Sequence, residues 1–171
     1  ALLAHRLRAA KARVDVEEDP RSLAVVGDPG SLGQVLTNLI GNALDAYEDT
    51  NGADRRLLVG IRRTGRHVVL TVRDWAGGMP AEVLARIFDE LYTTKAVGRG
   101  TGLGLWISRN LVEQGFGGTL DAESEPGVGS CFVVTLTGAE DDRNLRVPAD
   151  VPRVHADEPA RVDHEVGEAR Q

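Results

Sequence analysis

A stripe of polar side chains runs along one predicted helix. Gln34, Asn38, Asn42 and Asp45 follow one another at spacings of four, four and three residues, so a helix would place them on one face. Asparagine is a poor helix former, whereas an ordinary solvated face carries Glu, Lys and Arg. Mg²⁺ takes one or two such oxygen ligands and completes its shell with water and phosphate. The stripe therefore predicts either a magnesium–phosphate site or a polar face that satisfies nearby backbone groups.

A second acceptor is Asp74, which stands directly before Trp75-Ala76-Gly77-Gly78. It follows a predicted strand, and the small residues behind it leave room for a tight pocket. A carboxylate in such a pocket can accept a hydrogen bond from the exocyclic amino group of adenine. The alternative is a turn aspartate that bonds its own backbone two residues on.

Glycines alternate with other residues in the segment Gly98–Leu105, immediately before an apolar helical pattern. Glycine permits positive φ and close approach, and a helix N-terminus offers free N–H groups and a positive dipole to an anion. Such a loop is also typical of linkers and turns. We interpret residues 89–101 as a phosphate-binding lid.

Helices and hairpins are expected to position these residues. The pair Asp28-Pro29 starts a helix whose apolar residues recur every three or four positions to about residue 48. Strands are expected over 13–17, 57–63, 67–73, 119–124 and 130–137, a short extended piece over 23–26, and further helices over 80–88 and 102–114, the last stopped by Gly115. This order predicts an α+β fold, a two-layer α/β sandwich in which a mixed, mostly antiparallel sheet carries helices on one face.

Composition limits the organisation and the partners of the chain. Residues 1–12 are expected to end a preceding linker helix, 13–137 to form one domain, and the acidic, proline-containing tail 138–171 to be disordered. A net charge of −6 argues against nucleic-acid binding, and no apolar run is long enough to span a membrane. Cys131, the single cysteine, is expected to be a buried strand thiol and fits a cytoplasmic location.

Four motifs in one order resemble the N, G1, F and G2 boxes of the sensor histidine kinase catalytic domain. The matching segments are Asn38–Ala43, Asp74–Gly78, Ile87–Asp89 with Thr93–Lys95, and Gly98–Leu105. The resemblance covers residues 10–137, and the shared order of four short motifs identifies the family. Its fold is the Bergerat fold, which gyrase-type ATPases share.

The resemblance implies an ATP site with Mg²⁺. Asn42 would be the metal ligand, and Asn38 would order the metal–phosphate site. Asp74 would accept from adenine, and Gly78 would let the backbone close over the base. The candidate phosphate contacts are Lys95 first and Arg99 second, and the alternative for each is a solvated loop charge. The predicted nucleotide-binding set is Asn38, Asn42, Asp45, Asp74, Gly78, Lys95, Arg99, Gly100, Thr101, Gly102, Leu103 and Gly104, with Asn38 and Lys95 as catalytic candidates. The lid glycines are interpreted as a source of mobility, and Ala76 departs from the familiar glycine of the G1 box.

The residue at position 38 bears on the reaction. Gyrase-type relatives carry a glutamate there that activates water, and an amide cannot act as that base. The resemblance thus predicts a kinase domain that hydrolyses ATP poorly and presents its γ-phosphate to a histidine on a separate dimerisation and phosphoacceptor domain, with a response regulator downstream. The segment His5–Arg8 has only a faint likeness to a phosphoacceptor box, because it lacks the acidic neighbour and the proline. The alternatives are a serine kinase of the anti-sigma type, a gyrase-type ATPase and a degenerate nucleotide-binding scaffold.

Overall fold

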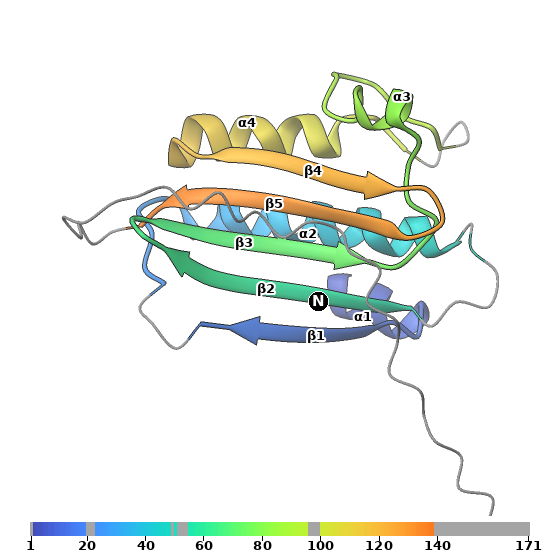
Figure 1. Ribbon diagram of the computed structural model, residues 1–171, viewed down its shortest axis with the longest axis horizontal. Helices are drawn as coiled ribbons and strands as arrows, with labels where there is room; N and C mark the ends of the chain where they lie inside the picture. The colour runs from blue at the N-terminus through green and yellow to red at the C-terminus, as the bar shows by residue number, and fades with distance from the viewer. Residues whose placement is uncertain (1, 20–22, 49, 51–54, 96–99, 139–171) are drawn as a thin grey trace, which may run out of the picture.

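The computed structural model describes residues 2–19, 23–48, 50, 55–95 and 100–138 (Figure 1). In chain order the elements are α1 (Leu2–Ala9), β1 (Arg13–Glu18), α2 (Pro29–Glu48), β2 (Arg56–Thr64), β3 (His67–Asp74), α3 (Ala81–Leu84), α4 (Gly104–Phe116), β4 (Thr119–Glu125) and β5 (Gly129–Thr137). Within these residues the strands form one five-stranded sheet in the order β1-β2-β3-β5-β4. β1 pairs with β2 in parallel, and the other neighbours are antiparallel.

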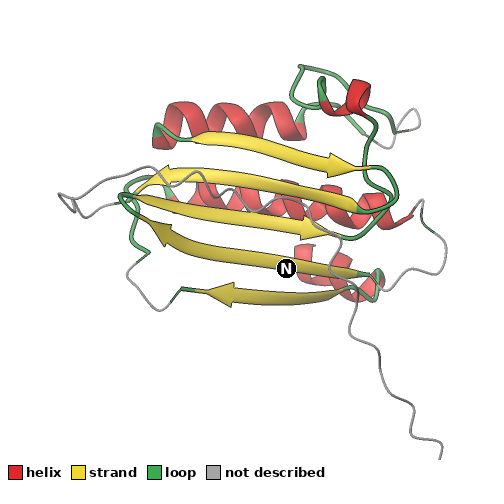
Figure 2. Ribbon diagram, in the orientation of Figure 1, coloured by secondary structure: helices red, strands yellow, loops and turns green. Residues whose placement is uncertain are grey.

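Helices α2 and α4 lie side by side on one face of the sheet (Figure 2). Their inward side chains, which include the fully buried Val35, Leu39 and Val112, form the main core with the strands. The predicted two-layer α+β fold with a mixed, mostly antiparallel sheet is confirmed. No helix in the described part of the chain is long and apolar enough to cross a bilayer.

Helix α2 begins where the sequence predicts. The carboxylate of Asp28 accepts the Ser31 backbone N–H at 2.6 Å and the Ser31 hydroxyl at 2.8 Å, which satisfies one of the free donors of the first turn. The same bonds hold the pKa of Asp28 below its ordinary value. Cys131 is also as expected, because it is buried in β5 and burial raises the pKa of its thiol to about 11.

Both helices around the predicted lid differ from their expected bounds. α3 ends at Leu84 rather than continuing to residue 88, because i→i+3 bonds such as Asp89 N–H to the Arg86 carbonyl at 2.9 Å replace the α-helical pattern. α4 begins at Gly104 and runs through Gly115 to Phe116. The prediction that Gly115 stops it is wrong, since Gly117 takes the left-handed conformation, with φ +58°, that ends the helix.

Two further expectations meet different outcomes. The extended piece expected over 23–26 is reduced to a single bridge between Val25 and Gly138. Residues 139–171 lie outside the described residues, so the disordered tail stays a prediction, as do the domain bounds. At the other end, α1 packs on α2 and the core through Leu3 and Leu7.

Candidate functional site

Three of the predicted site residues meet at the C-terminal half of α2. Asn42 and Asp45 stand three residues apart on one face of the helix, and the loop after α3 brings Lys95 to them. The Lys95 ammonium donates to Asn42 Oδ1 at 3.2 Å and to Asp45 Oδ2. About a quarter of the Asp45 side chain and a third of the Lys95 side chain are exposed. The group therefore combines two oxygen-bearing side chains with a partly exposed ammonium, and the ammonium is the group that can bind phosphate.

Asn38 makes a different kind of contact. Its amide nitrogen donates to the Gly104 carbonyl at 3.2 Å and to the Ser108 hydroxyl at 3.1 Å. The Ser108 hydroxyl, which is fully buried, in turn donates to the Gly104 carbonyl at 2.8 Å. Asn38 thus fastens α2 to the first turn of α4. The two asparagines of the stripe therefore differ in role. Asn38 uses its amide nitrogen to join α2 to α4, and Asn42 accepts a hydrogen bond from Lys95 with its amide oxygen.

We expect Asn38→Ala to lower the free energy of unfolding by about 1–2 kcal/mol, because both hydrogen bonds to α4 are lost and the buried Ser108 hydroxyl loses a donor. Urea unfolding measures this. Gln34→Ala is the matched control, since Gln34 lies in the same stripe but is exposed, and it should change stability by less than about 0.5 kcal/mol. Equal effects of the two substitutions would contradict the assigned contact.

Asp74 is held at the end of β3 by burial and backbone donors. Its side chain accepts the Ala76 N–H at 3.0 Å, and the residue is 3% exposed. Burial raises the pKa of its carboxyl to about 6, against the opposing effect of the backbone N–H groups of Ala76 and Ser130. The alternative of a turn aspartate that bonds its own backbone two residues on is therefore confirmed in its geometry. A carboxylate offers about four lone-pair sites, so these bonds leave capacity for a further donor.

Gly78 packs against the turn between β4 and β5. Its φ is +65°, and a Cβ there would lie 2.0 Å from the Glu125 carbonyl oxygen. Beside it, the Gly77 carbonyl accepts the Gly127 N–H at 2.8 Å, and the Met79 N–H donates to Ser124 Oγ at 2.8 Å. This packing requires glycine at position 78 whether or not a nucleotide is present. The approach of its backbone to adenine stays a prediction.

Tyr47 links α2 to the Asp74 segment, a role that the sequence did not indicate. Its hydroxyl accepts the Trp75 N–H at 2.9 Å and donates to the Arg56 carbonyl at 2.6 Å. The residue is fully buried and continues the apolar period of α2, so the sequence marked it only as core. Through it, the helix that carries Asn42 is tied directly to the residue after Asp74.

The described part of the predicted lid is closely packed around its glycines. Gly102 has φ +67°, and a Cβ there would lie 2.4 Å from the Leu91 carbonyl carbon; one on Gly100 would lie 2.9 Å from Thr93 Oγ1. Thr93 caps the loop, since its hydroxyl accepts the Lys95 N–H at 3.1 Å. These two glycines thus have a packing requirement besides the mobility that the sequence suggested.

The remaining lid residues are only partly described. Thr101 Oγ1 accepts the Leu103 N–H at 3.3 Å just before α4 begins at Gly104. Arg99, the second candidate phosphate contact, lies outside the described residues together with Gly98.

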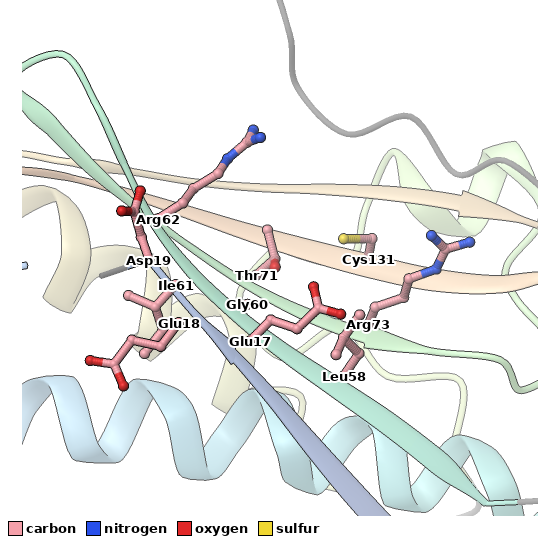
Figure 3. Close-up of a pocket in the computed structure, with 10 residues that line it drawn as sticks. All are labelled: Glu17, Glu18, Asp19, Leu58, Gly60, Ile61, Arg62, Thr71, Arg73 and Cys131. Atoms are coloured by element: carbon pink, nitrogen blue, oxygen red, sulfur yellow. The ribbon is translucent and has the colours of Figure 1, made fainter. Parts of the chain in front are cut away.

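Two surface hollows lie away from these residues. One, of about 420 Å³, is on the other face of the sheet around Gly60, where Glu17 points toward Arg73 (Figure 3). The other, of about 490 Å³, runs along α4 beside Trp106. Neither is lined by a residue of the predicted nucleotide-binding set. Among the described residues no three His, Cys, Asp or Glu side chains gather as a metal site. The hard oxygen donor Asn42 therefore fits Mg²⁺ only with phosphate and water as further ligands.

Comparison with known proteins identifies the family. Residues 27–140 match the model described as histidine kinase-, DNA gyrase B- and HSP90-like ATPase. The two-component sensor PprA of Pseudomonas aeruginosa PAO1 is 41% identical over 139 residues, 79% of this chain and 15% of that protein. The sensor histidine kinase ZraS of Klebsiella oxytoca is 43% identical over 118 residues, 68% of this chain and 24% of that protein.

A solved structure agrees with these relatives. The nucleotide-free catalytic domain of histidine kinase ThkA superposes with a TM-score of 0.67 at 28% identity, over 80% of this chain and 85% of that one. The match to this isolated domain is nearly full length, whereas the chain spans less than a quarter of PprA or ZraS. This chain belongs to the histidine kinase-, DNA gyrase B- and HSP90-like ATPase family, a family of nucleotide-binding domains, and its relatives within that family are the catalytic domains of sensor histidine kinases.

Proposed function

We propose that this domain binds ATP with Mg²⁺ and presents the γ-phosphate to a histidine on a separate dimerisation and phosphoacceptor domain. The observation that carries the proposal is the meeting of Asn42, Asp45 and Lys95 on α2, in a chain whose relatives are sensor histidine kinases. The phosphoryl group would leave the β–γ bridging oxygen of ATP, form a bond to a histidine nitrogen and release ADP. A response regulator would then receive it from that histidine.

Asn42, Lys95 and Asp74 each have a defined part in this proposal. The oxygen of Asn42 holds the metal, which neutralises phosphate charge when bound. Lys95 exchanges Asn42 and Asp45 for the phosphates, and Asp74 accepts the adenine amino group. The work of the protein is orientation, so that the γ-phosphoryl lies in line with the attacking nitrogen.

The contacts of Asn38 favour transfer over hydrolysis. Its amide nitrogen is engaged with Gly104 and Ser108, and an amide cannot take a proton from water. A gyrase-type ATPase, the second candidate, needs a base at this place. Steady ATP turnover by the domain alone would support that candidate, and acid-stable phosphate on the acceptor would support a serine kinase.

The metal assignment is tested by titrating a fluorescent ATP analogue with and without Mg²⁺. Wild-type protein should bind more tightly with Mg²⁺, and Asn42→Ala should lose about tenfold or more in affinity with the metal but little without it. Gln34→Ala, on the exposed part of the same stripe, should behave as wild type in both titrations. An Asn42→Ala protein that keeps its full Mg²⁺ dependence would contradict the assignment.

A further inference from the structure

Asp45 is shared by two cations that come from different parts of the chain. Lys95, from the loop after α3, bonds Asp45 Oδ2, and Arg6, from α1, bonds Asp45 Oδ1. The two contacts join segments 39 and 50 residues away from Asp45 in sequence. One carboxylate thus connects the N-terminal helix with the cation that the proposed function sends to the phosphates.

The place of Arg6 on α2 depends on a glycine. Its guanidinium donates to the Gly41 carbonyl at 3.4 Å as well as to Asp45. A Cβ on Gly41 would lie 2.8 Å from Arg6 Nη1, so the missing side chain leaves room for the guanidinium to lie across the helix. Leu3 and Leu7 pack α1 against the core on either side of Arg6. Apolar packing, close fit and charge therefore hold the guanidinium at this carboxylate.

Sharing a carboxylate weakens the hold on each cation. The positive charge of Arg6 partly neutralises Asp45 and repels the Lys95 ammonium, so Lys95 leaves Asp45 at lower cost when α1 is docked. After Lys95 has left, Asp45 interacts with Arg6 alone, and that contact becomes stronger.

We propose that Arg6 is a positioning residue, which acts through Asp45 to make Lys95 available to nucleotide phosphates, so that docking of α1 on α2 and nucleotide binding favour each other. This rests on the proposed function, because Lys95 must move to the phosphates. By linkage the coupling is reciprocal. The binding free energy that nucleotide gains from docked α1 equals the docking free energy that α1 gains from bound nucleotide. A change that pulls α1 from α2 therefore weakens ATP binding without touching an ATP-binding residue.

A double-mutant cycle tests the coupling through ATP affinity. Arg6→Ala should weaken Mg²⁺–ATP binding about two- to fivefold, the range for partly exposed ion pairs. In a Lys95→Ala background the same substitution should change affinity little, because no ammonium remains to be released. Arg6→Lys, which keeps the charge, should recover most of the wild-type affinity. Arg8→Ala is the control on the same helix, since Arg8 is exposed.

Hydrogen exchange of the α1 amides tests the coupling without nucleotide. Lys95→Ala should slow exchange in α1, since Asp45 is left to Arg6, and should have no such effect when Arg6 is also alanine. The proposal would be overturned if Arg6→Ala lowered ATP affinity equally in the wild type and in Lys95→Ala. It would also be overturned if the exchange rates of the α1 amides were the same in the wild type and in Lys95→Ala. If the wild-type protein bound no ATP, the proposed function would fail, and the exchange experiment would still decide whether Arg6 and Lys95 are coupled.

Discussion

Asp74→Asn is expected to lower the affinity of this domain for ATP about a hundredfold. The two backbone N–H groups that face Asp74, those of Ala76 and Ser130, both need an oxygen acceptor. An asparagine has one oxygen for them, and its NH₂ group would face the amino group of adenine, donor against donor. Titration with a fluorescent ATP analogue measures the loss, and Asp121→Asn, an exposed substitution on β4, should bind as wild type.

The same substitution should stabilise the nucleotide-free fold at neutral pH. The carboxyl of Asp74 has a pKa of about 6 in the fold against an ordinary 3.8, so between these values the folded state binds more protons than the unfolded state. Stability therefore falls as the pH rises from about 4 to 6, by about 3 kcal/mol in total, and stays reduced above that range. Asp74→Asn removes this dependence of stability on pH. At pH 7 the substitution should raise the free energy of unfolding by at most about 3 kcal/mol, because the amide accepts the Ala76 and Ser130 N–H groups less well than the carboxylate does.

Two measurements follow from this titration. Urea unfolding between pH 4 and pH 7 should show the wild type losing stability relative to Asp74→Asn. A hydrogen-bond donor from adenine favours the ionised carboxyl, so the ATP affinity of the wild type should rise as the pH passes through about 6. ATP itself also titrates, and the pH profile of Asp74→Asn measures that contribution alone. Parallel pH profiles of the two proteins would contradict both the pKa and the role of Asp74.

Gly78→Ala is expected to reduce the free energy of unfolding by more than about 3 kcal/mol. The new Cβ would lie 2.0 Å from the Glu125 carbonyl oxygen, and φ is +65°. The obstacle is backbone, and the Met79 N–H to Ser124 Oγ bond holds the segment against β4, so neither side moves away cheaply.

The neighbouring glycine provides the control for this substitution. A Cβ on Gly77 would meet nothing within 4 Å, and its φ is outside the positive range. Gly77→Ala should therefore change stability by less than about 1 kcal/mol. Urea unfolding of both variants measures the difference. If Gly78→Ala were as stable as Gly77→Ala, the turn between β4 and β5 would be able to move away from the new Cβ, and the prediction would be wrong.

Local signals in the sequence were sufficient for the long elements. The cap at Asp28 and the apolar period of α2 predicted that helix, and strand segments joined by glycine-containing turns predicted both hairpins. The same signals were misleading at the end of α4, where Gly115 and Gly117 could each end the helix. The helix runs past Gly115 because Phe116, four residues after Val112, is buried only if the helix continues.

The site was predictable as a face of a helix but not as a set of bonds. Spacing placed Asn42 and Asp45 on one face, but the contact that Lys95 makes with both of them was not foreseen. Nothing local indicates that Asn38 would use its nitrogen on residues 66 and 70 positions away. Such contacts depend on which helices the sheet order makes neighbours, and that order is a property of the whole chain.

The order of the strands also sets the order in which a growing chain can complete the molecule. β5 is the last strand in the part of the chain that the structure describes, yet it lies between β3 and β4. During synthesis β4 emerges before the strand with which it pairs, and Asp74 emerges long before Ser130, whose N–H it accepts. Since domains fold as units, a nascent chain that stalls before β5 leaves β4 unpaired and Asp74 without the Ser130 N–H. The ribosome must therefore deliver the final strand before this domain can hold a nucleotide.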